Sequence, residues 1–207
     1  MMRRLVVLAL AVLAAGCAPT LDAPVRADVM RSIVSSTVQL RLERAGIRRA
    51  ASGVVLAADP RTRQSWILTT RHFLAAWESQ PVSLISGRTR TVASVTAVAG
   101  NVDLAVLEVQ GVALPAVTLK ATSRLGDEVW VVSFPWGRRL TVKRGIVSQI
   151  AGEDGEAAVE GPARMVDVSV HYGASGGGVY DAATGELIGI VEGYRTARMT
   201  SKDAPSR

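Results

Sequence analysis

The stretch Gly173-Ala174-Ser175-Gly176-Gly177 places a serine inside a glycine-rich turn. Glycines around the serine permit a tight turn whose backbone N–H groups point the same way. A serine hydroxyl becomes a nucleophile when a neighbouring base takes its proton, and N–H groups beside it can stabilise a developing oxyanion. A flexible Gly/Ser loop is the competing interpretation, and this turn alone does not decide between the two.

Two segments closer to the N-terminus supply a candidate base and a candidate partner for it. The apolar run 66–68 leads through two threonines to His72, one of only 2 histidines in the chain. Asp103 stands directly before the apolar run 104–109, where we expect a partly buried carboxylate that needs a partner. Histidine exchanges a proton near neutral pH, and its ring N–H suits a carboxylate. A core histidine and an ordinary turn aspartate are the structural alternatives.

Short runs rich in Val, Ile, Leu and Thr recur along the chain, separated by Gly, Asp, Pro or Asn. This spacing predicts an all-β protein, either a sandwich or a barrel. Only 28–36 and 73–78 look helical, and both are short. The predicted strands are 37–42, 52–57, 65–69, 81–85, 92–99, 104–109, 128–133, 140–150, 157–160, 165–170 and 187–192.

The three chemistry-bearing segments resemble the catalytic motifs of trypsin-like serine proteases, and they occur in the same order along the chain. Thr69-Thr70-Arg71-His72 is similar to the Thr-Ala-Ala-His element of that family. Asp103-Leu104-Ala105-Val106-Leu107 is similar to its Asp-Leu-Ala-Val-Leu strand, and 173–177 is similar to Gly-Asp-Ser-Gly-Gly. The resemblance covers roughly 31–194.

Three further segments resemble HtrA-type members of the family in particular. They are Ala51-Ser52-Gly53-Val54-Val55-Leu56, the stretch from Gly126 through Phe134-Pro135-Trp136-Gly137 to Ser148, and Gly185-Glu186-Leu187-Ile188-Gly189-Ile190-Val191. The resemblance implies two six-stranded antiparallel β-barrels, at 31–115 and 116–207, with the active site in the cleft between them.

The resemblance also implies a serine endopeptidase that acts on a protein or peptide substrate and needs no metal or organic cofactor. His72, Asp103 and Ser175 would be catalytic, and the backbone N–H groups of Gly173 and Ser175 would form the oxyanion hole. The primary specificity pocket would involve Ser169, Val170 and Tyr172. Since Ser169 and Val170 carry no charge, we expect a preference for small or medium apolar side chains.

The sequence departs from the family pattern at two places. Ala174 replaces the usual Asp or Asn, which argues against activation by a newly cut N-terminus. No apolar final strand is visible in 194–207, so either the sequence is truncated or the second barrel closes unusually. The alternative function is therefore a weak or inactive protease-like lipoprotein that binds peptides or acts as a scaffold. His171 is an alternative base, but we expect it at the rim because it lies so near the nucleophile.

The N-terminus has the pattern of a lipoprotein export signal. A short basic start precedes an apolar run at 5–15, too short for a membrane span of roughly 20 residues. We expect 1–16 to be a signal peptide, Cys17 to carry lipid and 17–30 to be a tether. Ala18 resembles the outer-membrane sorting pattern, so we expect a lipid-anchored, periplasm-facing protein of the cell envelope. A plain secretory signal with an incidental cysteine is the alternative.

Composition favours a globular protein and argues against a nucleic-acid partner. Hydrophobic residues make up 48% and charged residues 20% of the chain. The formal net charge is +6, but aromatic residues are only 4% and no basic stripe is interleaved with them. The charge therefore indicates solubility and mild surface attraction. The single cysteine excludes an intrachain disulfide, and the sequence leaves the oligomeric state open.

Overall fold

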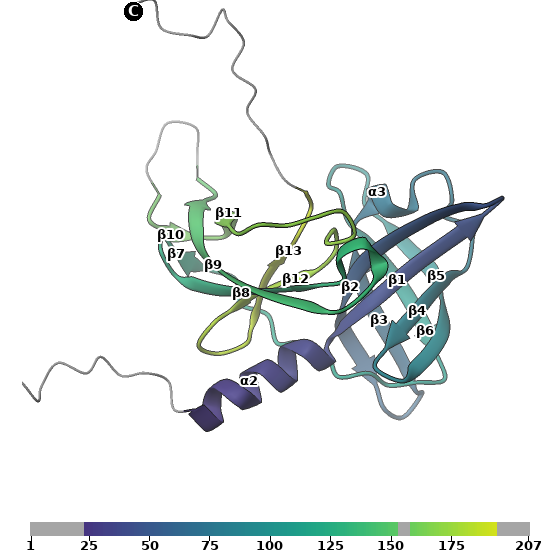
Figure 1. The fold of residues 1–207 in the computed structure, drawn as a ribbon, viewed down its shortest axis with the longest axis horizontal. Helices are drawn as coiled ribbons and strands as arrows, with labels where there is room; N and C mark the ends of the chain where they lie inside the picture. Colours follow the sequence, from purple (N-terminus) through teal and green to yellow (C-terminus); the bar gives the residue numbers. More distant parts are fainter. Residues whose placement is uncertain (1–22, 153–157, 194–207) are drawn as a thin grey trace, which may run out of the picture.

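The computed structural model describes residues 23–152 and 158–193, and these residues form mostly β-strands (Figure 1). The all-β prediction is confirmed. The predicted signal peptide, Cys17, the first residue of the predicted strand 157–160 and the segment 194–207 lie outside the described residues. One longer helix, α2 (Ala23–Ser35), precedes the strands. No helix among the described residues has the length and apolar character needed to cross a membrane.

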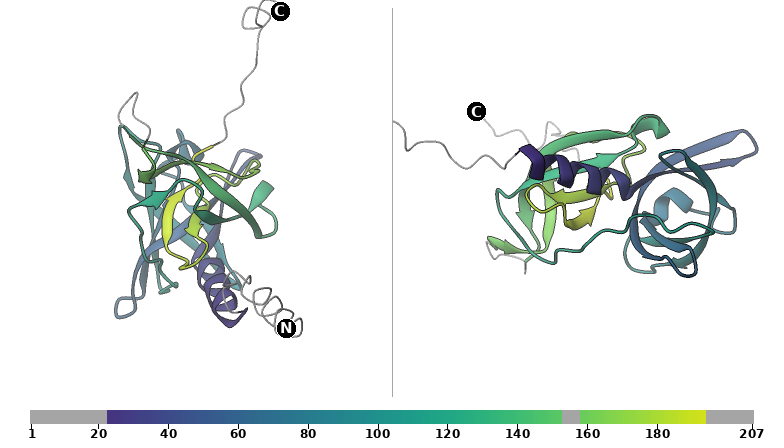
Figure 2. Two further views of the ribbon diagram at one scale, coloured as in Figure 1. Left: turned by 90° about the vertical axis from the view of Figure 1, so that its left-hand side faces the viewer. Right: turned by 90° about the horizontal axis from the view of Figure 1, so that it is seen from below.

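The first six strands close into a barrel in the order β1-β2-β3-β6-β5-β4, with every neighbouring pair antiparallel. Seen from below, the barrel appears as a ring beside the second sheet (Figure 2). Closure pairs every strand on both sides, so this barrel has no free edge. The strands are β1 (Thr37–Arg44), β2 (Ile47–Asp59), β3 (Gln64–Thr69), β4 (Val82–Ser86), β5 (Thr89–Val98) and β6 (Ala105–Gln110).

Alternation of side chains along these strands builds the core of the first barrel. In β3 the buried residues are Ser65, Ile67 and Thr69, which alternate with half-buried neighbours. Successive side chains of a strand point to opposite faces, so every second residue enters the barrel. The short helix α3 (Arg71–Leu74) follows β3, and its Phe73 and Leu74 join the same core.

The second half of the described chain forms an open, curled five-stranded sheet in the order β11-β9-β8-β12-β13. A two-stranded ribbon, β7 (Ser123–Arg124) with β10 (Glu160–Gly161), lies beside it, and a short 3₁₀ turn, η1 (Pro135–Gly137), follows β8. The sheet strands are β8 (Glu128–Ser133), β9 (Thr141–Ile150), β11 (Ala163–Asp167), β12 (Gly178–Asp181) and β13 (Leu187–Ile190).

Strand β12 was missed by the sequence pattern, and β11 ends at Asp167, earlier than predicted. A run of glycines precedes Val179 and Tyr180, which hides the strand from a search for apolar runs. All of β12 is buried because it pairs with β8 on one side and β13 on the other. The chain therefore enters the centre of the second sheet three residues after Ser175.

Helix α2 packs against the second sheet and begins at Ala23, within the range expected to be a tether. Its Val29 and Ile33 are buried in one cluster with Tyr180, which explains why the chain is ordered there. The hydroxyl of Tyr180 lies 2.9 Å from Oγ1 of Thr37, at the start of the first barrel. Burial raises the pKa of the Tyr180 phenol, so it stays protonated at this contact between the barrels.

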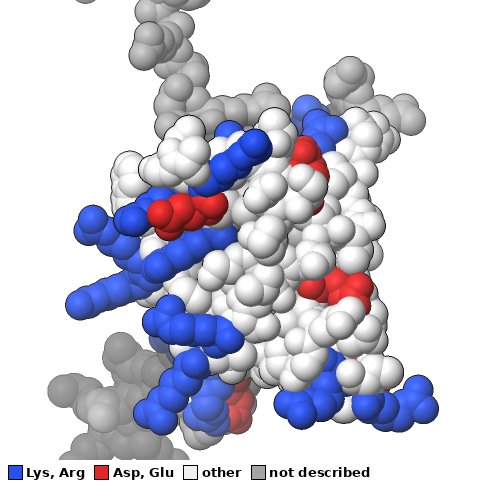
Figure 3. Space-filling model, turned by 90° about the vertical axis from the view of Figure 1, so that its right-hand side faces the viewer, with Lys and Arg blue, Asp and Glu red and all other residues white. Residues whose placement is uncertain are grey.

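Charged side chains are distributed unevenly over the first barrel. On the face drawn in Figure 3, Lys and Arg gather mainly along one edge and at the lower margin, with acidic side chains among them. The middle of this face is largely uncharged. Such a surface favours solubility and attracts anions weakly and in a salt-dependent way.

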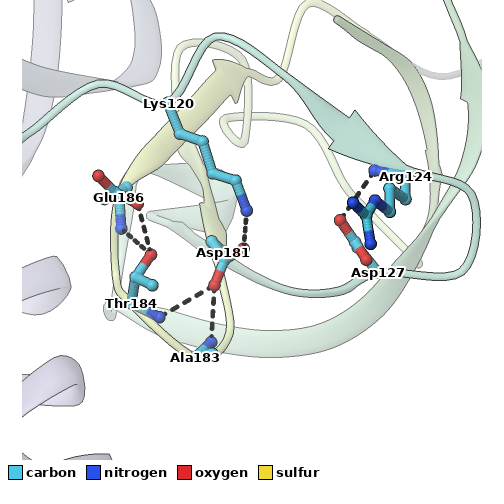
Figure 4. Close-up of polar contacts among 7 residues, drawn as sticks. All are labelled: Lys120, Arg124, Asp127, Asp181, Ala183, Thr184 and Glu186. Atoms are coloured by element: carbon cyan, nitrogen blue, oxygen red, sulfur yellow. Dashed lines mark hydrogen bonds and ion pairs between the residues drawn. The ribbon is translucent and has the colours of Figure 1, made fainter. Parts of the chain in front are cut away.

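A buried aspartate organises the turn that joins β12 to β13 (Figure 4). Asp181, with 8% of its surface exposed, accepts hydrogen bonds from the backbone N–H groups of Ala183 and Thr184 at 2.8 and 2.9 Å. Nζ of Lys120, from the segment that connects the barrels, lies 2.5 Å from the same carboxylate. Burial alone would raise the pKa of Asp181, but the hydrogen bonds from Lys120, Thr184 and Ala183 and the charge of Lys120 lower it overall.

We predict that Asp181→Asn lowers the free energy of unfolding by about 1.5–3 kcal/mol at pH 7, because it removes a charge-assisted hydrogen bond to Lys120. The lowered pKa of Asp181 means that the carboxylate stabilises the fold above its unfolded pKa of about 3.9, and that this contribution is lost as pH falls through the folded value. The difference between wild type and variant should therefore shrink in chemical denaturation at pH 3.

Glu160→Gln is the matched control, because Glu160 pairs with Arg124 at 3.1 Å but both side chains are more than half exposed. Its stability should stay within about 0.5 kcal/mol of wild type at both pH values. An Asp181→Asn cost that is equal at pH 7 and pH 3 would contradict the assignment of the effect to the charge.

Candidate active site

Strand pairing in the first barrel brings His72 and Asp103 together. Thr69, the last residue of β3, pairs with Ala105, the first residue of β6. His72 comes three residues after Thr69, and Asp103 comes two residues before Ala105. The two side chains therefore lie at the same end of the barrel. The backbone N–H of Arg71 donates to the carbonyl of Asp103 at 3.3 Å and closes the junction.

The three predicted catalytic side chains form one continuous chain of contacts. Asp103 accepts the backbone N–H of His72 at 2.8 Å through Oδ1, and its Oδ2 lies 2.5 Å from Nδ1 of the imidazole. Nε2 of the same ring lies 3.1 Å from Oγ of Ser175. The Asp103 side chain is 16% exposed and the His72 side chain 50% exposed, so the carboxylate is shielded while the ring faces the cleft.

This geometry suits a nucleophile, a base and a group that orients the base. A neutral His72 with its proton on Nδ1 donates to Asp103, which leaves the lone pair of Nε2 directed at the hydroxyl of Ser175. The arrangement can remove the proton of Ser175 as its oxygen attacks an electrophile.

Glycines allow the loop around Ser175 to pass very close to the first barrel. Gly173 and Gly176 have φ values of 86° and 78°, in the left-handed region that glycine occupies without strain. A Cβ on Gly176 would lie 2.1 Å from the carbonyl oxygen of Ser52, so no side chain fits there. The glycine-rich sequence is therefore a requirement of close packing between the barrels.

The backbone of this loop leaves two N–H groups available. The carbonyl of Tyr172 accepts from the N–H of Trp136 at 2.6 Å, and the carbonyl of Ala174 accepts from Gly177 at 2.8 Å. In a planar trans peptide the N–H points away from the carbonyl, so the N–H groups of Gly173 and Ser175 face the opposite way. Within 23–152 and 158–193 neither N–H has an acceptor. Both could bind an oxyanion.

A cleft of 1170 Å³ runs from His72 and Asp103 along the second sheet. Its walls combine apolar residues with charged residues at the surface. The apolar lining includes Val166, Val168, Val170, Val179, Ile188, Ile190 and Val191, and the charged lining includes Arg164, Asp167 and Glu192. Four of the lining residues, 188–191, belong to the segment 185–191 that resembles the HtrA-type motif, and the motif by itself assigns them no role in the site.

The three residues predicted for the specificity pocket lie in different surroundings. Val170 lines the cleft, whereas Ser169 and Tyr172 are exposed and are not among its lining residues. Tyr172 packs against Trp136, with ring centroids 5.5 Å apart and planes inclined by 39°. This aromatic pair stands beside the loop of Ser175, since Trp136 also bonds to the backbone of Tyr172.

The second histidine, His171, lies near the site, on the loop that leads to the nucleophile. His171 is exposed, its carbonyl accepts from the N–H of Ala174 at 2.9 Å, and in the described part of the chain its ring makes no hydrogen bond with Ser175. Residues 23–152 and 158–193 contain no group of three or more His, Cys, Asp or Glu side chains placed to hold a metal ion.

Comparison with known proteins agrees with this geometry. The family model described as a trypsin-like peptidase domain matches residues 51–190 of this chain. A probable periplasmic serine endoprotease, DegP-like, of Pseudomonas fluorescens is 33% identical over 142 residues, which is 67% of this chain and 28% of that protein. The serine endoprotease DegS of Salmonella typhimurium is 29% identical over 175 residues, which is 81% of this chain and 45% of that protein. The chain thus spans less than half the length of these relatives.

The solved structures with a similar fold also include HtrA-type proteases and a serine endoprotease. The HtrA-type protease AlgW, solved with a tripeptide, superposes with a TM-score of 0.63 at 26% identity, covering 80% of this chain and 53% of that one. The serine endoprotease from Yersinia pestis gives a TM-score of 0.65 at 24% identity, covering 84% of this chain and 58% of that one, and shows the fold. The predicted double-barrel fold is therefore confirmed, except that in the described residues the second barrel is a curled half-barrel of five strands instead of a closed barrel of six.

Proposed function

Because the chain belongs to the trypsin-like peptidase domain family, we propose that it is a serine endopeptidase whose catalytic residues are His72, Asp103 and Ser175. The observation that carries this proposal is the unbroken run of contacts from Asp103 through His72 to the hydroxyl of Ser175. A structural role alone would not require a half-exposed imidazole to bridge a shielded carboxylate and a serine.

In the proposed reaction, Oγ of Ser175 attacks the carbonyl carbon of the peptide bond while Nε2 of His72 takes its proton. Asp103 holds the ring and stabilises the imidazolium. The N–H groups of Gly173 and Ser175 bind the oxyanion of the tetrahedral intermediate. His72 then gives its proton to the leaving amine, which departs and leaves an acyl group on Ser175. Water repeats the sequence with His72 as base and releases the acid.

The proposal extends to the location of the enzyme. Relatives named as periplasmic endoproteases support a periplasm-facing site of action for this chain. The basic start, the apolar run and the cysteine at position 17 support export followed by lipid attachment. We extend the proposal to a lipid anchor on Cys17 in the outer membrane, with protein or peptide substrates in the envelope.

Ser175→Ala should abolish both proteolysis and labelling by a fluorophosphonate probe, because it removes the attacking oxygen. In a well-studied relative, losing the nucleophile costs on the order of 10⁶-fold in kcat. The exposed Ser94 of β5 supplies the control: Ser94→Ala should label and cleave like wild type. Labelling that survives in Ser175→Ala would place the nucleophile elsewhere, and a wild type that neither labels nor cleaves would favour a peptide-binding or scaffold role.

Cleavage should follow small or medium apolar residues such as Val or Ala, and not Arg or Lys. Val170 and its neighbours give the cleft apolar walls, and a cation buried against them would be strongly disfavoured unless an acid at the surface, such as Asp167 or Glu192, paired with it. A peptide-library profile measures the preference. Dominant cleavage after Arg or Lys would contradict the prediction. If Asp167→Asn then removed that preference, Asp167 would be the acid that binds the basic side chain.

Lipid on Cys17 should be detectable by incorporation of radiolabelled palmitate into the wild type expressed in a bacterial host. Cys17→Ser should incorporate none, because the thiol that carries the lipid is missing. Anchoring by two or more acyl chains is stable, whereas one chain binds only marginally, so the variant should also leave the membrane fraction. Equal incorporation by both proteins would refute the assignment.

A further inference from the structure

Ser52 of β2 makes four hydrogen bonds at the contact between the two barrels, and it is completely buried. Its hydroxyl donates to the carbonyl of Gly173 and accepts the N–H of Phe134, both at 2.8 Å. Its backbone N–H donates to the carbonyl of Ser175 at 2.8 Å, and its carbonyl accepts from Oγ1 of Thr69 at 2.8 Å. One residue therefore touches the loop of the nucleophile, the strand that leads to His72 and the segment after β8.

The hydrogen bonds of Ser52 complete a set that holds every carbonyl from Tyr172 to Ser175. Trp136 and Gly177 hold the carbonyls of Tyr172 and Ala174. Ser52 holds the other two, at Gly173 through its hydroxyl and at Ser175 through its N–H. Because each peptide unit is planar, a fixed carbonyl also fixes the N–H of the next residue. Trp136 and Gly177 thus fix the two peptides that carry the Gly173 and Ser175 N–H groups, and Ser52 fixes the two peptides that follow them in the loop. The orientation of this loop thus depends on a residue of the opposite barrel.

We infer that Ser52 is a positioning residue that keeps the N–H groups of Gly173 and Ser175 directed at the substrate oxyanion. This inference rests on the proposed function. The hydroxyl acts as a bridge, since it receives the N–H of Phe134 and donates to Gly173. It thereby also sets the position of Trp136, two residues after Phe134, whose N–H holds the peptide that carries the Gly173 N–H.

Loss of the hydroxyl should loosen this loop in particular. Gly173, at φ 86°, has no side chain to restrict its rotation, so the peptide between Gly173 and Ala174 can turn once its carbonyl is released. The adjoining peptides, which carry the Gly173 and Ser175 N–H groups, would then shift with it. The N–H groups would then be less well aimed at the charge that develops during the reaction. Interactions made only in the transition state affect kcat, whereas contacts of the bound substrate with the cleft walls determine KM. Ser52→Ala should therefore lower kcat and leave KM nearly unchanged.

Ser65→Ala is a matched control for Ser52→Ala. Ser65 of β3 is also completely buried, and its hydroxyl also donates to one carbonyl and accepts one N–H, of Val112 at 3.0 Å and Leu114 at 2.9 Å. Each alanine variant therefore removes the side-chain partner of one backbone carbonyl and of one backbone N–H. Ser52→Ala and Ser65→Ala should therefore lower the Tm by similar amounts. A difference between their catalytic rates then shows that the hydroxyl matters because it lies next to the loop of Ser175.

The experiment compares wild type, Ser52→Ala and Ser65→Ala in peptide hydrolysis, in fluorophosphonate labelling and in inhibition by a peptide boronic acid. The boronate forms a tetrahedral adduct on the nucleophilic serine and places an oxygen at the oxyanion position. We expect Ser52→Ala to lower kcat by about 10- to 100-fold, less than the 10²- to 10³-fold typical when an oxyanion donor is deleted. Its affinity for the boronate should fall by a similar factor, while KM changes less than about twofold.

Three results would overturn the inference. They are a kcat of Ser52→Ala that equals that of Ser65→Ala, a loss in KM instead of kcat, and unfolding of Ser52→Ala under conditions where Ser65→Ala stays folded. The first and the third would show that Ser52 serves the fold alone, and the second would show that it acts on substrate binding instead of on the oxyanion. A wild type that neither hydrolyses peptides nor labels would instead contradict the proposed function, and with it any catalytic role of Ser52.

Discussion

The hydrogen bonds between Ser52 and the loop of Ser175 join the two barrels at the place where the nucleophile must meet its base. The N–H of Ser52 holds the carbonyl of Ser175, and the carbonyl of Ser52 leaves no room for a Cβ on Gly176. His72 and Asp103 belong to the first barrel and Ser175 to the second. This contact helps to maintain the 3.1 Å distance between Nε2 of His72 and Oγ of Ser175.

Each barrel holds its own part of the site by different means. In the first barrel, complete closure and the pairing of β3 with β6 place His72 next to Asp103, because both side chains leave the barrel at one end. In the second, the chain after Ser175 runs directly into β12, which is buried between β8 and β13. This pairing restrains the nucleophile relative to its sheet, and preorganisation of this kind is a large source of electrostatic stabilisation in catalysis.

The turn after β12 contributes to the stability of the second sheet and also positions a strand that lines the cleft. Asp181 holds that turn through Ala183 and Thr184 and binds Lys120 of the connecting segment. The same turn sets the start of β13, whose residues Ile188 and Ile190 line the cleft. A buried ion pair contributes little net stability on its own, but breaking it leaves a charge without a partner. Loss of one partner therefore affects both the stability of the fold and the turn that leads into β13.

The sequence by itself was sufficient for the strand content, the candidates His72, Asp103 and Ser175 and the likeness to one family, because short motifs and the two-residue alternation of strands are local properties of the chain. It missed β12, whose burial comes from its neighbours in the sheet and not from an apolar run. It also assigned no role to Ser52, and of the residues that it predicts for the specificity pocket only Val170 lines the cleft. Only the tertiary structure could decide these points, because hydrogen-bond partners and cleft walls come from segments far apart in the chain, such as 52 and 173.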